Sequence, residues 1–171
     1  MKCNLLFLTL ALWGSTLNAQ NTVIWSDSIV VASTPQPITA PRIALLKDGT
    51  PLITWGVSGN FVTTTSQIWC SRFEGGAFSA PVGVLPDPMQ PSLFGFGGYD
   101  VAVSDSQLFV VFEQTQEGIF LSRSDDGGIT FQPPNLVQPP ISGGYATLAS
   151  VGVDGTGNPI VSYIRDKNGA T

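Results

Sequence analysis

The feature that most constrains this chain is an internal repeat. Residues 42–55, 100–112 and 150–163 share one pattern, and successive copies end at a spacing of roughly fifty residues. Each copy reads as a strand, a turn that contains an aspartate, and a second strand that ends in an aromatic residue. We therefore expect each copy to form a β-hairpin.

A second hairpin pattern lies between these copies, at residues 68–78 and again at 119–131. The pair Ser71-Arg72 in the first aligns with Ser122-Arg123 in the second. Proline-rich connections follow at 81–91 and 133–140, and no 3.6-residue helical period appears after residue 20. One unit therefore holds four antiparallel strands.

A repeated four-stranded antiparallel sheet of this length is typical of a β-propeller blade. A single sheet cannot bury both of its faces, whereas stacked blades bury them against one another. The sequence predicts an all-β fold with one blade over residues 40–81, a second over 98–134, and a third that begins near Tyr145.

Composition excludes several classes of function. Only 7 residues are Lys or Arg against 12 that are Asp or Glu, so we expect no nucleic-acid partner. The chain has no histidine, which excludes Ser-His-Asp and Cys-His catalysis and His-ligated zinc within it. We expect no metal and no cofactor. Cys70 reads as a small buried residue, because no histidine or nearby base would activate it.

Residues 1–19 are predicted to be a secretory signal peptide. Lys2 gives a positive start, residues 5–14 form a short apolar run, and Leu17-Asn18-Ala19 offers a cleavage site before Gln20. The run is shorter than the ~20 residues that span a bilayer, and an uncleaved anchor is the alternative. We expect secretion or cell-surface localisation, with no later membrane-spanning segment.

The segment 124–131 carries a motif of the form Ser-x-Asp-x-Gly-x-Thr-aromatic. It resembles the Asp box, or BNR repeat, of the sialidase superfamily, whose defining positions fall here on Ser124, Asp126, Gly128, Thr130 and Phe131. The resemblance implies a structural turn between the third and fourth strands of a blade, away from any active site. The local chemistry agrees, because an aspartate accepts backbone N–H groups across a tight turn and a glycine tolerates a positive φ.

This resemblance extends more loosely over residues 22–171. Sialidase-like propellers have six blades, and this chain supplies about two and a half of them. We therefore expect residues 20–171 to be the N-terminal part of a longer propeller. The alternative is a natural short chain that oligomerises to complete a ring.

The resemblance also raises the question of catalysis. In sialidases an Arg-Ile-Pro motif opens the first inner strand and its arginine binds the sialic acid carboxylate; here Arg42-Ile43-Ala44 occupies that place without the proline. The family's acid/base aspartate follows the second strand, but between Asp48 and Asp87 the only acidic residue is Glu74. We assign no catalytic residue. The leading interpretation is a secreted, non-catalytic propeller that binds glycan or an extracellular protein, and the alternative is a truncated exo-α-sialidase or related glycoside hydrolase.

The candidate binding residues come from aligning the innermost strands. Arg42, Asp100 and Ser150 occupy equivalent positions in successive units, so all three are expected to face the mouth of a central channel, with Arg42 paired to Asp100. Two weaker signals are interpreted as loops. Residues 154–158 read as a hairpin turn rather than a calcium loop, and residues 94–98 read as a connection between blades.

Overall fold

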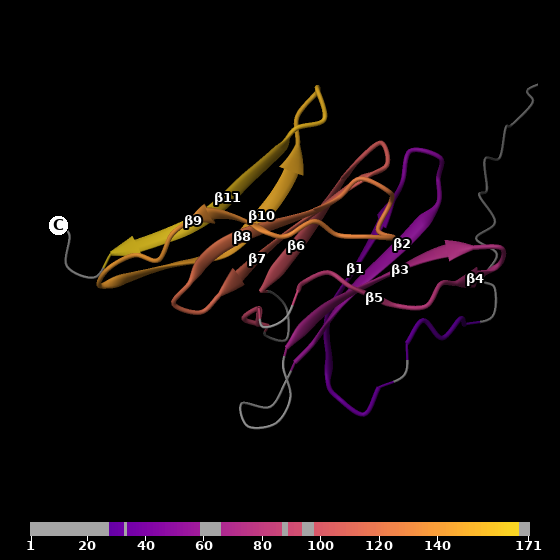
Figure 1. Cartoon of the computed structure of the whole chain (residues 1–171), viewed down its shortest axis with the longest axis horizontal. Helices are drawn as coiled ribbons and strands as arrows, with labels where there is room; N and C mark the ends of the chain where they lie inside the picture. The colour runs from indigo at the N-terminus through magenta and orange to yellow at the C-terminus, as the bar shows by residue number, and fades with distance from the viewer. Residues whose placement is uncertain (1–27, 33, 59–65, 87–88, 94–97, 168–171) are drawn as a thin grey trace, which may run out of the picture.

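The computed structural model describes residues 28–32, 34–58, 66–86, 89–93 and 98–167, and these residues contain strands and turns but no helix. The strands form three antiparallel sheets that follow one another along the chain (Figure 1). The predicted all-β, propeller-type arrangement of two complete blades and a half is therefore confirmed. The predicted signal peptide lies outside the described residues.

The first blade is a five-stranded sheet in which β1, β2, β3 and β4 are neighbours in that order and β5 also pairs with β3. Its strands are β1 (Ile38–Leu45), β2 (Pro51–Val57), β3 (Gln67–Glu74), β4 (Ala77–Phe78) and β5 (Val82–Gly83). Leu52, Thr54, Ile68 and Cys70 point from β2 and β3 into the layer shared with the second blade and are fully buried.

The second blade has four strands in sequential order, and the third has two. The second consists of β6 (Tyr99–Ser104), β7 (Gln107–Gln114), β8 (Gly118–Ser124) and β9 (Asn135–Gln138). The third consists of β10 (Gly144–Val153) and β11 (Pro159–Lys167). The segment 154–158 is the turn of the β10–β11 hairpin, as expected.

The outermost strands differ from the prediction. The sequence pattern predicts that the fourth strand of the second blade follows the Asp box directly, but its paired strand, β9, begins only at Asn135. In the first blade the outer edge is divided into β4 and β5. Proline explains the difference, because it cannot donate to a strand ladder and is tolerated at edges. The proline-rich segments contain short edge strands rather than only connections.

Two apolar layers hold the blades together, and β7 contributes to both. Leu108, Val110 and Phe112 point into the layer shared with the first blade, while Phe109 and Val111 point into the layer shared with the third. All five are at most 2% exposed. A strand buried on both faces is what a stack of blades requires.

The outer faces of the stack carry exposed apolar side chains. Ile43 and Leu45 on β1 are 70% and 60% exposed, and Ile160 and Ile164 on β11 are 58% and 53% exposed. Among the described residues no helix is long and apolar enough to cross a membrane.

Candidate functional site

The three sequence-predicted binding residues meet across neighbouring blades. Arg42 Nε lies 3.7 Å from Asp100 Oδ1, so the expected ion pair is present. On the other side, the Ser150 hydroxyl donates to Asp100 Oδ2 at 2.5 Å and the Val151 N–H donates to the same oxygen at 3.2 Å. Asp100 thus joins the innermost strands of all three blades, and we call Arg42, Asp100 and Ser150 the inner-strand row.

A shared backbone irregularity places this row. Ala40, Gly98 and Leu148 all have positive φ, at 47°, 97° and 52°, and each lies two residues before one member of the row. In β1 and β10 the irregularity is a β-bulge, because the pairing register shifts between Thr39 and Arg42 and between Thr147 and Ser150. A bulge redirects the side chain that follows it.

Gly98 meets a different requirement from the two bulges. A Cβ built at this position would lie 2.0 Å from the backbone oxygen of Ser92. No other residue could adopt this approach without moving the chain. Positive φ at a non-glycine residue such as Ala40 or Leu148 is uncommon and clusters at functional sites.

The buried side chain of Tyr99 contacts the first blade next to the inner-strand row. Its side chain is 2% exposed, its hydroxyl donates to the Ala40 carbonyl at 2.6 Å, and it lies 3.3 Å from Thr54 Oγ1. The Arg42 guanidinium carbon lies over its ring, 5.9 Å from the centroid. Burial raises the pKa of Tyr99 to about 12, so its hydroxyl stays protonated as a donor.

Glu113 extends the polar contacts along β10. The Thr147 hydroxyl donates to Glu113 Oε2 at 2.5 Å. Thr147 and Ser150 flank the β10 bulge, so two carboxylates of the second blade each accept a hydroxyl hydrogen bond from the third blade, one on either side of the bulge. Sequence reasoning missed Glu113, for which the available signal is a carboxylate at the end of an apolar strand. It also missed the supporting role of Tyr99.

The inner-strand row is suited to binding by hydrogen bonds. The Arg42 and Asp100 side chains are 34% and 27% exposed, so solvent and ligands can reach both. The pair offers donors and acceptors with its charge already balanced. The described residues include no group of three or more His, Cys, Asp or Glu side chains that could hold a metal ion.

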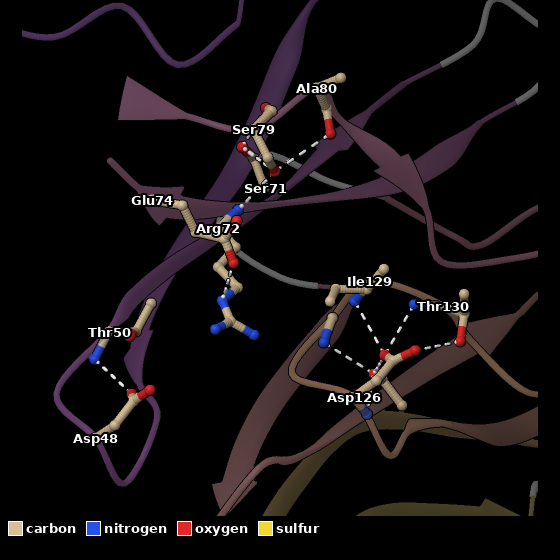
Figure 2. Close-up of polar contacts among 12 residues, drawn as sticks. Asp48, Thr50, Ser71, Arg72, Glu74, Ser79, Ala80, Asp126, Ile129 and Thr130 are labelled. Carbon is tan, nitrogen blue, oxygen red and sulfur yellow. Dashed lines mark hydrogen bonds and ion pairs between the residues drawn. The ribbon is translucent and has the colours of Figure 1, made fainter. Parts of the chain in front are cut away.

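The Asp box follows β8, and the donors that bond its Asp126 carboxylate lie within the same turn (Figure 2). Asp126 accepts from the Ile129 and Thr130 N–H groups at 3.0 and 2.9 Å and from the hydroxyls of Ser124 and Thr130 at 2.7 and 2.5 Å. Ser124 Oγ in turn accepts from the Gly128 N–H at 2.8 Å. Burial opposes ionisation of Asp126, but hydrogen bonds from Thr130, Ser124 and Ile129 outweigh it and lower the pKa to about 2.

The same turn packs against the first blade. A Cβ added at Gly127 would lie 2.7 Å from Arg72 Nη1, and one added at Gly128 would lie 2.9 Å from Cys70 Sγ. Phe131 packs against the apolar layer between the two blades. Burial raises the pKa of Cys70 to about 12, so this thiol is a packing group and not a nucleophile. These contacts favour the structural interpretation of the box, which stays a prediction.

Arg72 lies between two aspartate-bearing turns. Figure 2 shows its side chain extending from β3 into the space between the turn of Asp48 and that of Asp126. Its Nε forms an ion pair with Glu74 Oε1 at 2.8 Å, although the angle is not that of a hydrogen bond. The pKa of Asp48 is lowered mainly by hydrogen bonds from Thr50, with a smaller contribution from the Arg72 charge.

The turn between β10 and β11 in the third blade has hydrogen bonds like those of the Asp box. Asp154 Oδ1 accepts from the Thr156 hydroxyl at 2.7 Å and from the N–H groups of Thr156 and Asn158 at 2.8 and 2.9 Å. These bonds, the Thr156 hydroxyl first, lower the pKa of Asp154 to about 2. Its carboxylate is used by the turn itself, in agreement with the prediction of a hairpin.

No protein-family model and no curated protein sequence matches this chain. Among solved structures, it is similar to the crystal structure of a thermostable family-43 glycoside hydrolase, with a TM-score of 0.52 and 15% sequence identity. The similarity covers 82% of this chain and 58% of that one, so this chain spans less than two thirds of its structural neighbour. At this identity the likeness shows the fold alone. The chain therefore has a propeller-type all-β fold like that of a glycoside hydrolase, and membership of the sialidase superfamily stays a prediction.

Proposed function

We propose that this chain is part of a secreted or cell-surface propeller that binds glycan through the inner-strand row, without catalysis. The observation that carries the proposal is the Arg42–Asp100–Ser150 contact across three blades. Polar groups at equivalent positions of successive inner strands offer alternating donors and acceptors, which suits a ligand with several hydroxyl groups.

The ion pair bears on what this surface accepts. An isolated arginine would offer its guanidinium fork to a carboxylate. Arg42 instead has Asp100 beside it, and the Asp100 charge would repel an anionic ligand. An acidic sugar would have to displace or approach this carboxylate, whereas a neutral sugar would not.

The alternative is a glycoside hydrolase, of sialidase type or another. It is supported by the likeness to a family-43 glycoside hydrolase and by the position of Arg42 on the first inner strand. The pattern of carboxylates supports binding more than hydrolysis, because Asp100 and Glu113 are each engaged by hydroxyls of the third blade. A general acid must instead be free to transfer its proton to the substrate.

A glycan array together with a turnover assay separates the two functions. The expected result for the full protein is glycan binding that Arg42→Ala weakens, with no hydrolysis of a fluorogenic sialoside between pH 4 and pH 8. Lys47→Ala is the matched control, since Lys47 pairs with Asp105 in the turns that follow β1 and β6. Turnover that disappears in Arg42→Ala, with circular dichroism unchanged, would establish the hydrolase instead.

Export is the second part of the proposal. Secreted protein should begin near Gln20, which intact-mass measurement determines directly. Exported material that still carries Met1 would contradict the predicted signal peptide.

A further inference from the structure

A pocket at the start of β10, the strand that carries Ser150, is lined by none of the residues of the inner-strand row. It has a volume of about 230 Å³ and lies between the β7–β8 hairpin and the start of β10. This is slightly below the range of about 300–1,000 Å³ found for drug-sized ligands, so the pocket is of a size for one ring. Glu113, which lines it, is also the acceptor for Thr147 at the β10 bulge.

The polar lining of this pocket offers acceptors. Its lining includes the side chains of Glu113, Gln114, Thr115 and Gln116, each of which carries an oxygen that can accept a hydrogen bond. Glu113 contributes a carboxylate of which one oxygen, Oε2, is bonded to Thr147. None of the described lining residues is a lysine or an arginine. Because a carboxylate accepts hydrogen bonds and repels anions, the pocket favours a ligand that donates hydrogen bonds and carries no negative charge.

The apolar lining offers a flat contact surface. Tyr145 is 49% exposed although it lines the pocket, and Pro140 and Ile141 lie on the adjoining connection. An exposed aromatic ring with a polar tip suits a ligand that is apolar on one face and polar at its edge. A sugar ring has this character, with C–H groups on its faces and hydroxyls around its rim.

The backbone around the pocket is fixed by close contacts. Gln116 in the β7–β8 hairpin has φ of 64°, and Gly118 has φ of 116°. A Cβ added at Gly118 would lie 2.0 Å from the Gln138 backbone oxygen, so only glycine allows the hairpin to approach β9 this closely. A positive φ at a non-glycine residue is a local strain of the kind found at binding sites.

We infer that this pocket is a second subsite, which binds a neutral, hydroxyl-rich sugar ring of the same glycan that contacts the inner-strand row. This inference rests on the proposed glycan-binding function. The charge-balanced Arg42–Asp100 pair and the Glu113 carboxylate of the pocket both favour neutral sugars over sialic acid. The two sites are linked through β10, since Glu113 and Asp100 accept hydrogen bonds on either side of its bulge.

The test uses an array of immobilised glycans that contains neutral oligosaccharides and their sialylated counterparts. The full protein should bind neutral members more strongly than the matched sialylated ones. Tyr145→Ala should weaken that binding at least tenfold, and Tyr145→Phe should retain most of it, because the ring face remains. Ile160→Ala is the control, because Ile160 is also an exposed apolar residue of the third blade and lies outside the pocket.

The outcomes separate this inference from the function on which it rests. If Arg42→Ala abolishes binding but Tyr145→Ala does not change it, the pocket is not a subsite and the glycan-binding proposal stands. Stronger binding to sialylated glycans also overturns the inference, without affecting the proposed function. If no glycan binds, both are wrong.

Discussion

Asp126 and Asp100 have similar numbers of hydrogen-bond and ion-pair partners, but those partners lie in different parts of the molecule. Every hydrogen-bond donor to Asp126 lies within four residues of it. Asp100 instead takes its partners from the two adjoining blades, at Arg42 and Ser150. A carboxylate whose hydrogen-bond donors all lie in its own turn stabilises that turn without help from the neighbouring blades. A carboxylate whose partners lie in neighbouring blades depends on the alignment of those blades. It also faces the surface, where a ligand could compete for the same partners.

This contrast predicts the largest effect for the local carboxylate. Asp126→Ala would leave the Ile129 and Thr130 N–H groups and two hydroxyls without their acceptor. We expect the free energy of unfolding to fall by about 1–3 kcal/mol, measured by denaturant unfolding, with glycan binding retained at the other end of the blade. Unchanged stability together with lost binding would reverse the assignment of the Asp box as structural.

Low pH should remove the contribution of the Asp126 carboxylate to stability. The pKa of Asp126 is lowered from 3.8 to about 2, so its stabilising contribution is complete above about pH 4 and is lost as the pH falls toward 2. The difference in unfolding free energy between the unmodified protein and Asp126→Ala should therefore shrink over that window. Asp154 titrates in the same range in both proteins, and the comparison removes its contribution. A difference that stays constant from pH 5 to pH 2 would contradict this.

A variant of Tyr99 tests whether the inner-strand row depends on this side chain for its position. Tyr99→Phe keeps the ring beneath Arg42 but removes the donor to the Ala40 carbonyl. We expect a stability loss of about 0.5–1.5 kcal/mol and weaker glycan binding, because the bulge that aims Arg42 is released. Thr54→Val is the control, since it removes the other polar contact of Tyr99 and leaves the Ala40 bond intact. Equal binding losses in both variants would indicate a general packing defect.

The fold was predictable because its causes are local and repeated. Alternating apolar residues and aspartate-bearing turns each appear three times at a spacing of roughly fifty residues, and stacking follows from sheets that are apolar on both faces. The outer strands were predicted wrongly, because a proline-rich segment such as 133–140 reads as a connection even when Asn135–Gln138 pairs with β8. Edge strands need few ladder bonds, so their sequence signal is weak.

The candidate site was predictable only in part. Aligning the repeats brought Arg42, Asp100 and Ser150 together, since equivalent positions in a propeller meet at the channel. The bulges at Ala40 and Leu148 had no signal, because neither residue type favours a positive φ. At Ala40 this conformation accompanies a contact between blades, the hydrogen bond from the Tyr99 hydroxyl to the Ala40 carbonyl. Local sequence indicates the hydrogen bonds that form within a turn, whereas contacts between blades become visible only in the three-dimensional structure.

The smallest expected effect on stability is at Asp100, and it sharpens the comparison most. Asp100→Asn keeps an oxygen to accept from Ser150 and Val151 but removes the charge beside Arg42. A partly exposed ion pair at 3.7 Å contributes about 0–1 kcal/mol, so denaturant unfolding should change little. Binding should change more, because Arg42 becomes free to pair with an anion. Sialylated glycans that the unmodified protein binds weakly should then bind more strongly on the array, and Arg42→Ala in the same background should remove the gain. A stability loss as large as that of Asp126→Ala, without a shift in glycan preference, would show that both carboxylates serve the fold alone.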